Sequence, residues 1–366
     1  MTLGTDFHRR LEQILSCPTA PFDEGLVHAS IRETVRRTQG LRASEDADGN
    51  LLVTYGRGRP GLVFACHTDH PALRAEGDGT ATVLGGMPPH PLEASMLVGA
   101  RLRSFDPDGP RAQVTRILSS KRPMRVRLRA AGKLRKGQSL ILDLPDLRLS
   151  GGRLQARVVD DLVAAAACLT LFDRLRRARY RGTVGALFTR AEEVGFGGAL
   201  GWVRNTRLPR STTIVNLEMS KALPHTPFGA GPILRVGDRS TIFDADVSLE
   251  LETVARELAG GSPSFRYQRA LMDGGGCEAT IYAGAGFRAG ALCLPLGNTH
   301  NHSPRGGMKM EYVDQEDAEN LVCWMTAYTR QHGKLDPVRL RKRLHEALWR
   351  RSRATLKRTA RRVKES

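Results

Sequence analysis

Histidine and carboxylate residues recur in this sequence at points where apolar runs end. A His-x-Asp pair lies in VFACHTDH, and adjacent carboxylates lie in RVVDDLV and LFTRAEEVGF. The candidates, completed by a glutamate in NLEMS and a histidine in NTHNHSP, are His67, Asp69, Asp160, Glu192, Glu193, Glu218 and His302. Imidazole and carboxylate are ligands that zinc and similar metals take. Two such ions about 3.5–4 Å apart can polarise a carbonyl and activate one shared water. The set therefore predicts a two-metal hydrolytic site.

Each candidate taken alone also has an ordinary structural explanation. The His-x-Asp pair could be a surface or capping pair, and Asp160 could be a helix N-cap. Glu218 could be an exposed residue at a strand end, and His302 could be an ordinary loop histidine. Glu192 and Glu193 are harder to explain in this way, because adjacent like charges cost energy unless a cation is present. The joint occurrence of all these residues in one order favours the metal site.

The elements that must position these residues alternate between strands and helices. The continuous apolar run 61–66 ends at His67 and is typical of a parallel strand that is buried on both faces. The pattern predicts a helix over 162–175, and strands over 183–188 and 212–217. This alternation indicates an α/β fold, for which we expect a three-layer α/β/α domain with a mainly parallel mixed sheet.

A different pattern occupies residues 71–152. Short β-like runs such as AQVTRIL and SLILDL are separated by Gly, Pro and Asp, and no helical period is evident. We predict a small β-barrel-like domain inserted into a catalytic domain that consists of 1–70 and 153–333. Because His67 and Asp160 flank the insertion, the inserted domain could cover the site or serve in assembly.

Composition limits the class of protein. The 366 residues are 40% hydrophobic and contain no apolar stretch of about 18 residues, so no membrane span is expected. The polar N-terminus lacks the apolar segment of a signal peptide. The six cysteines are scattered without a CxxC spacing, which disfavours a disulfide framework or a thiolate zinc site. A reducing, cytoplasmic location is expected.

The net charge of +18 is concentrated at the C-terminal end. Residues 334–366 contain 13 Lys or Arg against 3 Asp or Glu, and they contribute +10. Leu340, Leu344 and Leu348 are spaced by four residues, which predicts an apolar stripe on a helix. This extension could be a solvated segment that raises solubility, an arm that binds nucleic acid or another acidic surface, or a segment that docks on another subunit. Any nucleic-acid binding should be independent of sequence.

In order and local context, the candidate residues resemble the co-catalytic metallo-aminopeptidases of clan MH, especially the branch of tetrahedral and glutamyl aminopeptidases. The resemblance covers residues 7–328, including the inserted β domain. It implies an aminopeptidase that removes N-terminal residues from peptides with two divalent metal ions. Zinc is expected, and cobalt or manganese could substitute. It also implies that the domain at 71–152 is a dimerisation domain, so that the protein forms a dimer or a larger homo-oligomer.

The resemblance also implies a role for each residue of the first metal site. His67 is expected to bind this metal, and Asp69 to orient the imidazole of His67. Asp160 is expected to bridge the two metals, and Glu218 to bind the first of them. Asp161 is expected to follow a cis peptide bond. Glu218 stands where the family usually has an aspartate, so its side chain is longer by one methylene.

The remaining roles concern the second metal and the proton transfer. Glu193 and His302 resemble ligands of the second metal, and Glu192 resembles the general base that accepts a proton from water and passes it to the leaving amine. The sequence departs from the family pattern at His70 and Leu162, and within Gly275–Gly276–Cys277–Glu278–Ala279. These departures leave the substrate preference open. A metal-dependent deacylase or carboxypeptidase on the same fold remains an alternative, as does an inactive hydrolase fold with a polyanion-binding tail.

Overall fold

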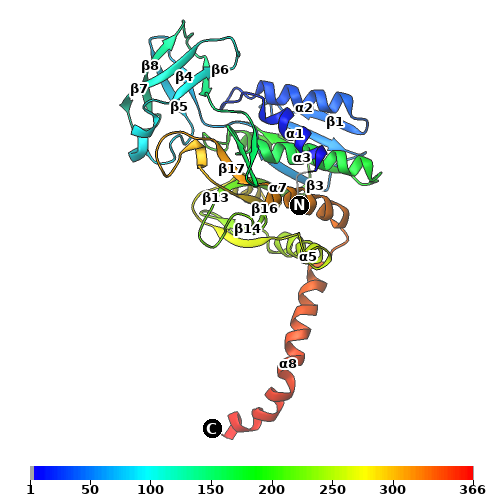
Figure 1. Ribbon diagram of the computed structural model, residues 1–366. Helices are drawn as coiled ribbons and strands as arrows, with labels where there is room; N and C mark the ends of the chain where they lie inside the picture. Colours follow the sequence, from blue (N-terminus) through cyan, green and yellow to red (C-terminus); the bar gives the residue numbers. More distant parts are fainter. Residues whose placement is uncertain (1–3, 366) are drawn as a thin grey trace.

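A computed structural model describes residues 4–365 of the chain. An α/β unit with an eight-stranded sheet lies beside a closed six-stranded barrel, and a long C-terminal helix projects from the α/β unit (Figure 1). Between residues 4 and 365, no helix is both long enough and apolar enough to cross a membrane. The arrangement confirms the α/β class and the barrel-like body that the sequence predicted.

The large sheet has the strand order β1-β2-β12-β3-β13-β16-β14-β15. Its strands are β1 (Leu41–Glu45), β2 (Leu51–Tyr55), β3 (Leu62–His67), β12 (Val184–Thr189), β13 (Thr213–Lys221), β14 (Ile233–Asp238), β15 (Gln268–Met272) and β16 (Arg288–Leu296). The four central strands β12, β3, β13 and β16 run parallel to one another. Antiparallel pairs flank this centre, with β2 beside β12 and β14 beside β16. The sheet is therefore mixed with a parallel centre, as predicted.

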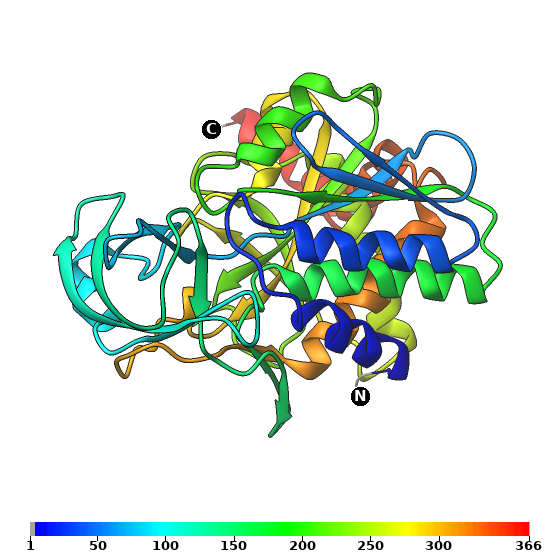
Figure 2. The same cartoon turned by 90° about the horizontal axis from the view of Figure 1, so that it is seen from above.

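Helices cover both faces of this sheet. One face carries α1 (Thr5–Leu15), α2 (Gly25–Arg37), α3 (Leu162–Arg177), α5 (Ala245–Gly261) and α7 (Gln315–Gln331), and the other carries α4 (Gly197–Asn205) and α6 (Glu278–Gly284). Figure 2 shows α1, α2 and α3 side by side in dark blue, blue and green. Successive residues of a strand point to opposite faces. Phe64 and Cys66 of β3 therefore pack into the larger core, and Val63 and Ala65 pack with α4 and α6. Burial on both faces explains the continuous apolar run.

The barrel closes in the order β4-β5-β8-β7-β6-β9. Its strands are β4 (Ala72–Ala75), β5 (Thr80–Leu84), β6 (Arg101–Ser104), β7 (Arg111–Ser119), β8 (Arg125–Ala131) and β9 (Ser139–Leu142), and a short 3-10 helix, η1 (Pro91–Leu97), joins β5 to β6. Strand β8 shows the alternation of inward and outward side chains that is typical of a small barrel, because Val126 and Leu128 are buried while Arg127 is exposed. All six strands lie within residues 71–152, but the division into domains and the role in dimerisation stay predictions.

A small sheet connects the barrel to the α/β unit. It has the order β10-β11-β17 and consists of β10 (Arg148–Ser150), β11 (Arg153–Ala156) and β17 (Glu311–Asp314). Strand β11 leads to Asp160 at the start of α3, and β17 follows the loop that contains the 3-10 turn η2 (Thr299–Asn301). The final element is α8 (Pro337–Glu365). The small sheet thus brings two distant loops of the sequence to the same place.

Candidate metal centre

The register of the central strands brings several candidate residues to one edge of the sheet. His67 is the last residue of β3 and pairs with Thr189, the last residue of β12. Asn216 of β13 pairs with Ala65 of β3, so Glu218, two residues further along, reaches the level of His67. The carboxyl ends of parallel strands are where α/β proteins place their ligand sites. The positions of these residues therefore follow from the order of the strands.

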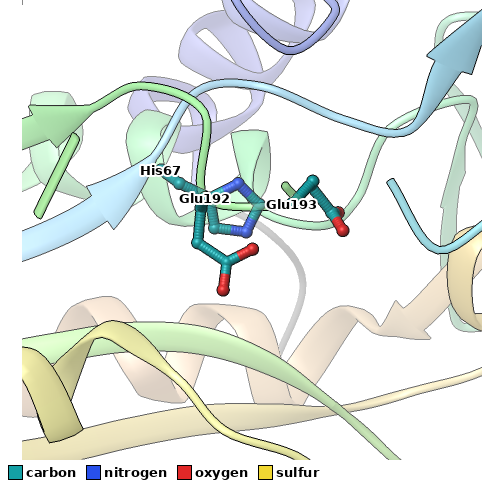
Figure 3. Close-up of side chains that lie close together, drawn as sticks. All are labelled: His67, Glu192 and Glu193. Carbon is teal, nitrogen blue, oxygen red and sulfur yellow. The ribbon is translucent and has the colours of Figure 1, made fainter. Parts of the chain in front are cut away.

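Asp69 holds the turn that carries the two adjacent glutamates. Its carboxylate accepts hydrogen bonds from the backbone N–H groups of Glu192 (2.9 Å) and Glu193 (3.1 Å). With a proton on Nδ1, the His67 ring donates to the Asp69 carbonyl at 3.2 Å. That tautomer leaves the lone pair of His67 Nε2 available. Figure 3 shows the His67 ring beside the side chains of Glu192 and Glu193. Asp69 therefore orients both the imidazole and the glutamates.

The first group of potential ligands contains His67, Asp160 and Glu218. Their ligand atoms all lie within 4.8 Å of one another. His67 Nε2 lies 3.2 Å from Asp160 Oδ1 and 3.8 Å from Glu218 Oε1. A tetrahedral ion with bonds of about 2.0–2.2 Å separates its ligands by roughly 3.3–3.6 Å. The spacing therefore suits a metal ion. The peptide bond between Asp160 and Asp161 is cis, as the family resemblance implied.

The second group contains Asp160, Glu193 and His300. His300 Nε2 lies 3.2 Å from Glu193 Oε2 and 3.9 Å from Asp160 Oδ2. The two carboxylate oxygens of Asp160 thus face different groups, with Oδ1 toward His67 and Oδ2 toward His300. A carboxylate in this position can bridge two cations.

His302, which the sequence led us to expect as a ligand of the second metal, belongs to neither group in this structure. Its Nε2 lies 2.6 Å from Met96 Sδ and 3.7 Å from the carboxylate of Glu93, both in η1. Asn298, His300 and Asn301 all have positive φ angles, between 52° and 62°. These angles reverse the loop locally, so that His300 and not His302 faces Asp160. The sequence signal was present, since both histidines lie in NTHNHSP, but it did not distinguish them.

Glu311 is a positioning residue that the sequence did not reveal. Its Oε2 accepts hydrogen bonds from the backbone N–H groups of Val159 (2.8 Å) and Asp160 (3.0 Å), and its Oε1 accepts from the N–H of His300 (2.7 Å). Burial raises the pKa of Glu311 to about 7, although these bonds to the backbone oppose the rise. One buried carboxylate therefore ties together the two loops that carry Asp160 and His300.

His70 and Gly86 also hold the loops that carry Asp160 and His300. Burial lowers the pKa of His70 to about 3, so its ring is neutral at neutral pH. With a proton on Nδ1, that ring donates to the Asp160 carbonyl at 2.8 Å. The Gly86 carbonyl accepts from His300 Nδ1 at 2.6 Å, and a Cβ at Gly86 would lie 2.8 Å from that nitrogen. Glycine at position 86 thus allows the loop after β5 to pack against the imidazole.

The electrostatics of the site fit bound cations. Burial raises the pKa of Asp160 to about 7, with Glu218 adding to the rise, and burial also raises the pKa values of Glu192 and Glu193 well above their usual range. Burial alone would lower the pKa of His67. Hydrogen bonds to the surrounding carboxylates, Asp160 first, outweigh this effect and hold the pKa well above its usual range. Among the described residues, Glu193 Oε1 and Glu218 Oε2 are buried without a hydrogen-bond partner. Buried carboxylates without partners are costly, and cations would offset that cost.

Several solved structures share this fold. PhTET1 of Pyrococcus horikoshii, solved as a dodecamer, has 20% identity and a TM-score of 0.72, with 89% of this chain and 99% of that chain covered. A TET aminopeptidase from a marine-sediment Thaumarchaeota archaeon has 20% identity and a TM-score of 0.72, with 87% and 95% covered. Aminopeptidase APDkam598 of Desulfurococcus kamchatkensis has 21% identity and a TM-score of 0.71, with 88% and 94% covered. At these identities the likeness shows the fold.

The sequence itself matches one protein family, although no curated protein matches it. The model of the M42 glutamyl aminopeptidase family matches residues 129–322, which are more than half of the chain. The matched segment contains four carboxylates of the site, namely Asp160, Glu192, Glu193 and Glu218. The chain therefore belongs to the M42 glutamyl aminopeptidase family and is a metal-dependent aminopeptidase.

Proposed function

We propose that the protein hydrolyses the N-terminal peptide bond of peptides at a centre of two divalent cations. The observation that carries this proposal is the position of Asp160, whose two oxygens face two separate ligand groups. His67, Asp160 and Glu218 would hold the first cation, and Asp160, Glu193 and His300 would hold the second. Zinc is the expected ion, and cobalt or manganese could replace it because nitrogen and oxygen sites discriminate weakly among these metals.

When bound, two such cations polarise the scissile carbonyl and lower the pKa of a shared water. Glu192 is the group that moves the proton. Its carboxylate lies within 4.8 Å of ligand atoms of His67 and Glu193. It accepts one proton from the attacking water and donates that proton to the nitrogen of the leaving amine, so it ends in its starting state. Burial raises the pKa of Glu192, whereas neighbouring cations lower the pKa of a carboxyl group, and a group that both accepts and donates the proton needs a pKa between these extremes.

The residues around Glu192 act by position. Asp69 fixes the backbone of Glu192 and the ring of His67 through the hydrogen bonds described above. Glu311 fixes the loops of Asp160 and His300. A shift of about 1 Å in such a group can reduce the rate of a reaction by two orders of magnitude. These positioning contacts therefore contribute to catalysis without touching the substrate.

The proposal extends to assembly. PhTET1 has been solved as a dodecamer and is described as assembling into a tetrahedron or a larger octahedral shell. The part of this chain between β5 and β8 exposes Leu92 (88%), Val98 (48%) and Leu118 (39%). Single exposed apolar side chains are common on protein surfaces, so the main support is the assembly described for PhTET1. We propose that the barrel forms the contact of a homodimer, and that dimers can associate further.

All six cysteines are unpaired, which supports a cytoplasmic location.

A panel of reporter substrates tests the reaction. Aminoacyl reporters with a free N-terminus should be cleaved, and the same reporters with an acetylated N-terminus should not. Preferred cleavage of acetylated reporters would indicate a deacylase, and release of the C-terminal residue from peptides would indicate a carboxypeptidase. Either result would contradict the aminopeptidase proposal.

The substitution Glu192→Gln tests the mechanism. The amide cannot accept a proton, so activity should fall by about 10²–10⁴-fold while the metal content stays unchanged. Glu257→Gln makes the same chemical change at an exposed position on α5 and should leave activity unchanged. If Glu192→Gln retains a tenth of the activity, the loss is below about 1.4 kcal/mol. That loss would be too small for a general base.

A further inference from the structure

The last helix, α8, stands apart from the rest of the molecule. It contains 29 residues, which correspond to about 43 Å, and it projects away from the α/β unit (Figure 1). Near its start, Arg341 forms an ion pair with Asp246 of α5. Most described side chains beyond Arg343 are exposed. The match to the peptidase family ends at residue 322, and the proposed hydrolysis uses no residue of α8. This helix therefore needs a separate explanation.

Large apolar side chains gather on one side of α8. Leu348 (51% exposed), Trp349 (48%), Leu356 (51%) and Val363 (76%) all face solvent. At 3.6 residues per turn, they fall within an arc of about 100°. Val338, 53% exposed near the start of the helix, falls on the same arc. We call these five residues the apolar arc. A line of exposed Trp, Leu and Val side chains along one side is unfavourable for a helix that is surrounded by water.

Basic side chains occupy the opposite side. Arg343, Arg350, Arg351, Lys357 and Arg358 fall within an arc of about 120° that is centred across the helix from the apolar arc. Among the described residues of α8, Arg341 forms an ion pair with Asp246, and Arg350 forms one with Glu346.

Further basic residues border the apolar arc. Lys342 and Arg353 lie next to its Trp349 edge, and Arg341, which pairs with Asp246, lies just inside its Leu348 edge. Long basic side chains at such borders can extend their charged ends toward an interface while their methylene groups cover apolar surface. Repulsion between like charges three or four residues apart also weakens the isolated helix, and an anionic partner would relieve it.

We propose that α8 is an amphipathic anchor that lies on an anionic membrane surface. The apolar arc would enter the boundary between headgroups and acyl chains, and the basic residues would attract acidic headgroups. This mode differs from a membrane span, which none of the described helices provides. Duplex nucleic acid would also attract the basic residues, but it would leave the apolar arc in water. The partner must therefore offer negative charge and an apolar layer together, and an anionic bilayer offers both.

Trp349 provides a direct assay on the full-length protein. The other two tryptophans, Trp202 (3% exposed) and Trp324 (0%), are buried, so a change of environment is reported mainly by Trp349. We expect the emission to shift to the blue with vesicles of phosphatidylcholine and phosphatidylserine. We expect little shift with phosphatidylcholine alone, and weaker binding as the salt concentration rises.

Two sets of variants separate the apolar contribution from the charge. Leu348→Ser together with Leu356→Ser keeps the charge and should weaken vesicle binding at least about tenfold, while elution from heparin stays unchanged. Arg351→Gln, Arg353→Gln and Arg358→Gln together should weaken vesicle binding by roughly 100-fold at low salt. The matched triple lysine variant keeps the charge and should bind like the wild type. Cleavage of aminoacyl reporters should stay unchanged in every variant, which shows that the fold is intact.

Four results would overturn the proposal. The first is vesicle binding that does not depend on Leu348 and Leu356. The second is salt-dependent binding to duplex DNA with no binding to anionic vesicles, which would make α8 a nucleic-acid arm. The third is a blue shift of Trp349 emission that depends on protein concentration in the absence of lipid, which would indicate that α8 docks on a second copy of the chain. The fourth is the absence of binding to both anionic vesicles and duplex DNA, which would leave α8 as a solubilising extension.

Discussion

His300 and His302 are two residues apart, and the structure gives them different surroundings. His300 Nε2 lies 3.2 Å from Glu193 Oε2 and 3.9 Å from Asp160 Oδ2. The Gly86 carbonyl accepts from the other ring nitrogen, which directs the Nε2 lone pair toward the carboxylates. Substitution of His300 by alanine would therefore remove one of the three protein ligands that we propose for the second cation. Substitution of His302 by alanine removes a ring that faces Met96 and Glu93.

The expected magnitude follows from this geometry. Loss of a residue that merely orients a ligand typically reduces metal affinity 10–100-fold. Loss of the ligand itself should exceed that range, so His300→Ala should weaken the second cation by at least about 100-fold, or roughly 2.7 kcal/mol. The first cation should bind almost as in the wild type, because its group, His67, Asp160 and Glu218, remains intact. His302→Ala should change neither affinity by more than about threefold.

Zinc titration against a chromophoric chelator measures both affinities. The metal-free variants should first be compared by urea unfolding, so that a loss of folding is not mistaken for a loss of a ligand. The reasoning is refuted if His302→Ala loses the second cation while His300→Ala keeps both. That result would mean that the loop of η2 adopts a different conformation around the bound metals.

Two further predictions concern stability and assembly. Burial lowers the pKa of His28 to about 4 in the folded protein, against about 6.5 in the unfolded chain. Between pH 6.5 and 4 the unfolded chain therefore binds more protons, and the stability of the folded protein falls as the pH falls. Between pH 7.5 and 5, His28 contributes about 2 kcal/mol to this loss of stability. The free energy of urea unfolding of His28→Gln should therefore depend less on pH, by that amount. An unchanged pH dependence would argue against a buried neutral imidazole. Light scattering should give a particle of at least twice the 40.2 kDa chain mass, and a monomer at micromolar concentration would contradict assembly through the barrel.

The sequence revealed those parts of the fold whose burial leaves a local pattern. The run 61–66 became β3 (Leu62–His67), and the Ala- and Leu-rich segment 162–175 became α3 (Leu162–Arg177). Both elements are apolar over most of their length because they pack inside the layered domain. The barrel was predictable as a class, because strands such as β8 alternate between buried and exposed residues.

The parts of the site that sequence reasoning missed depend on contacts between distant segments. Glu311 accepts hydrogen bonds from Val159 and Asp160, about 150 residues earlier in the chain, and no local pattern records such a contact. The position of His300 rather than His302 beside Asp160 depends on positive φ angles within the loop. The apolar spacing of the C-terminal extension predicted helix, but its continuous projection from the body is visible only in the structure.

Metal content is the most direct test of the central claim that this site holds two cations. Purified protein should be exposed to zinc, freed of excess metal by gel filtration and measured by elemental analysis. The geometry of the two groups that share Asp160 predicts two zinc ions per chain. A content near zero, with no rise in thermal stability on addition of zinc, would contradict the two-cation site and the mechanism built on it.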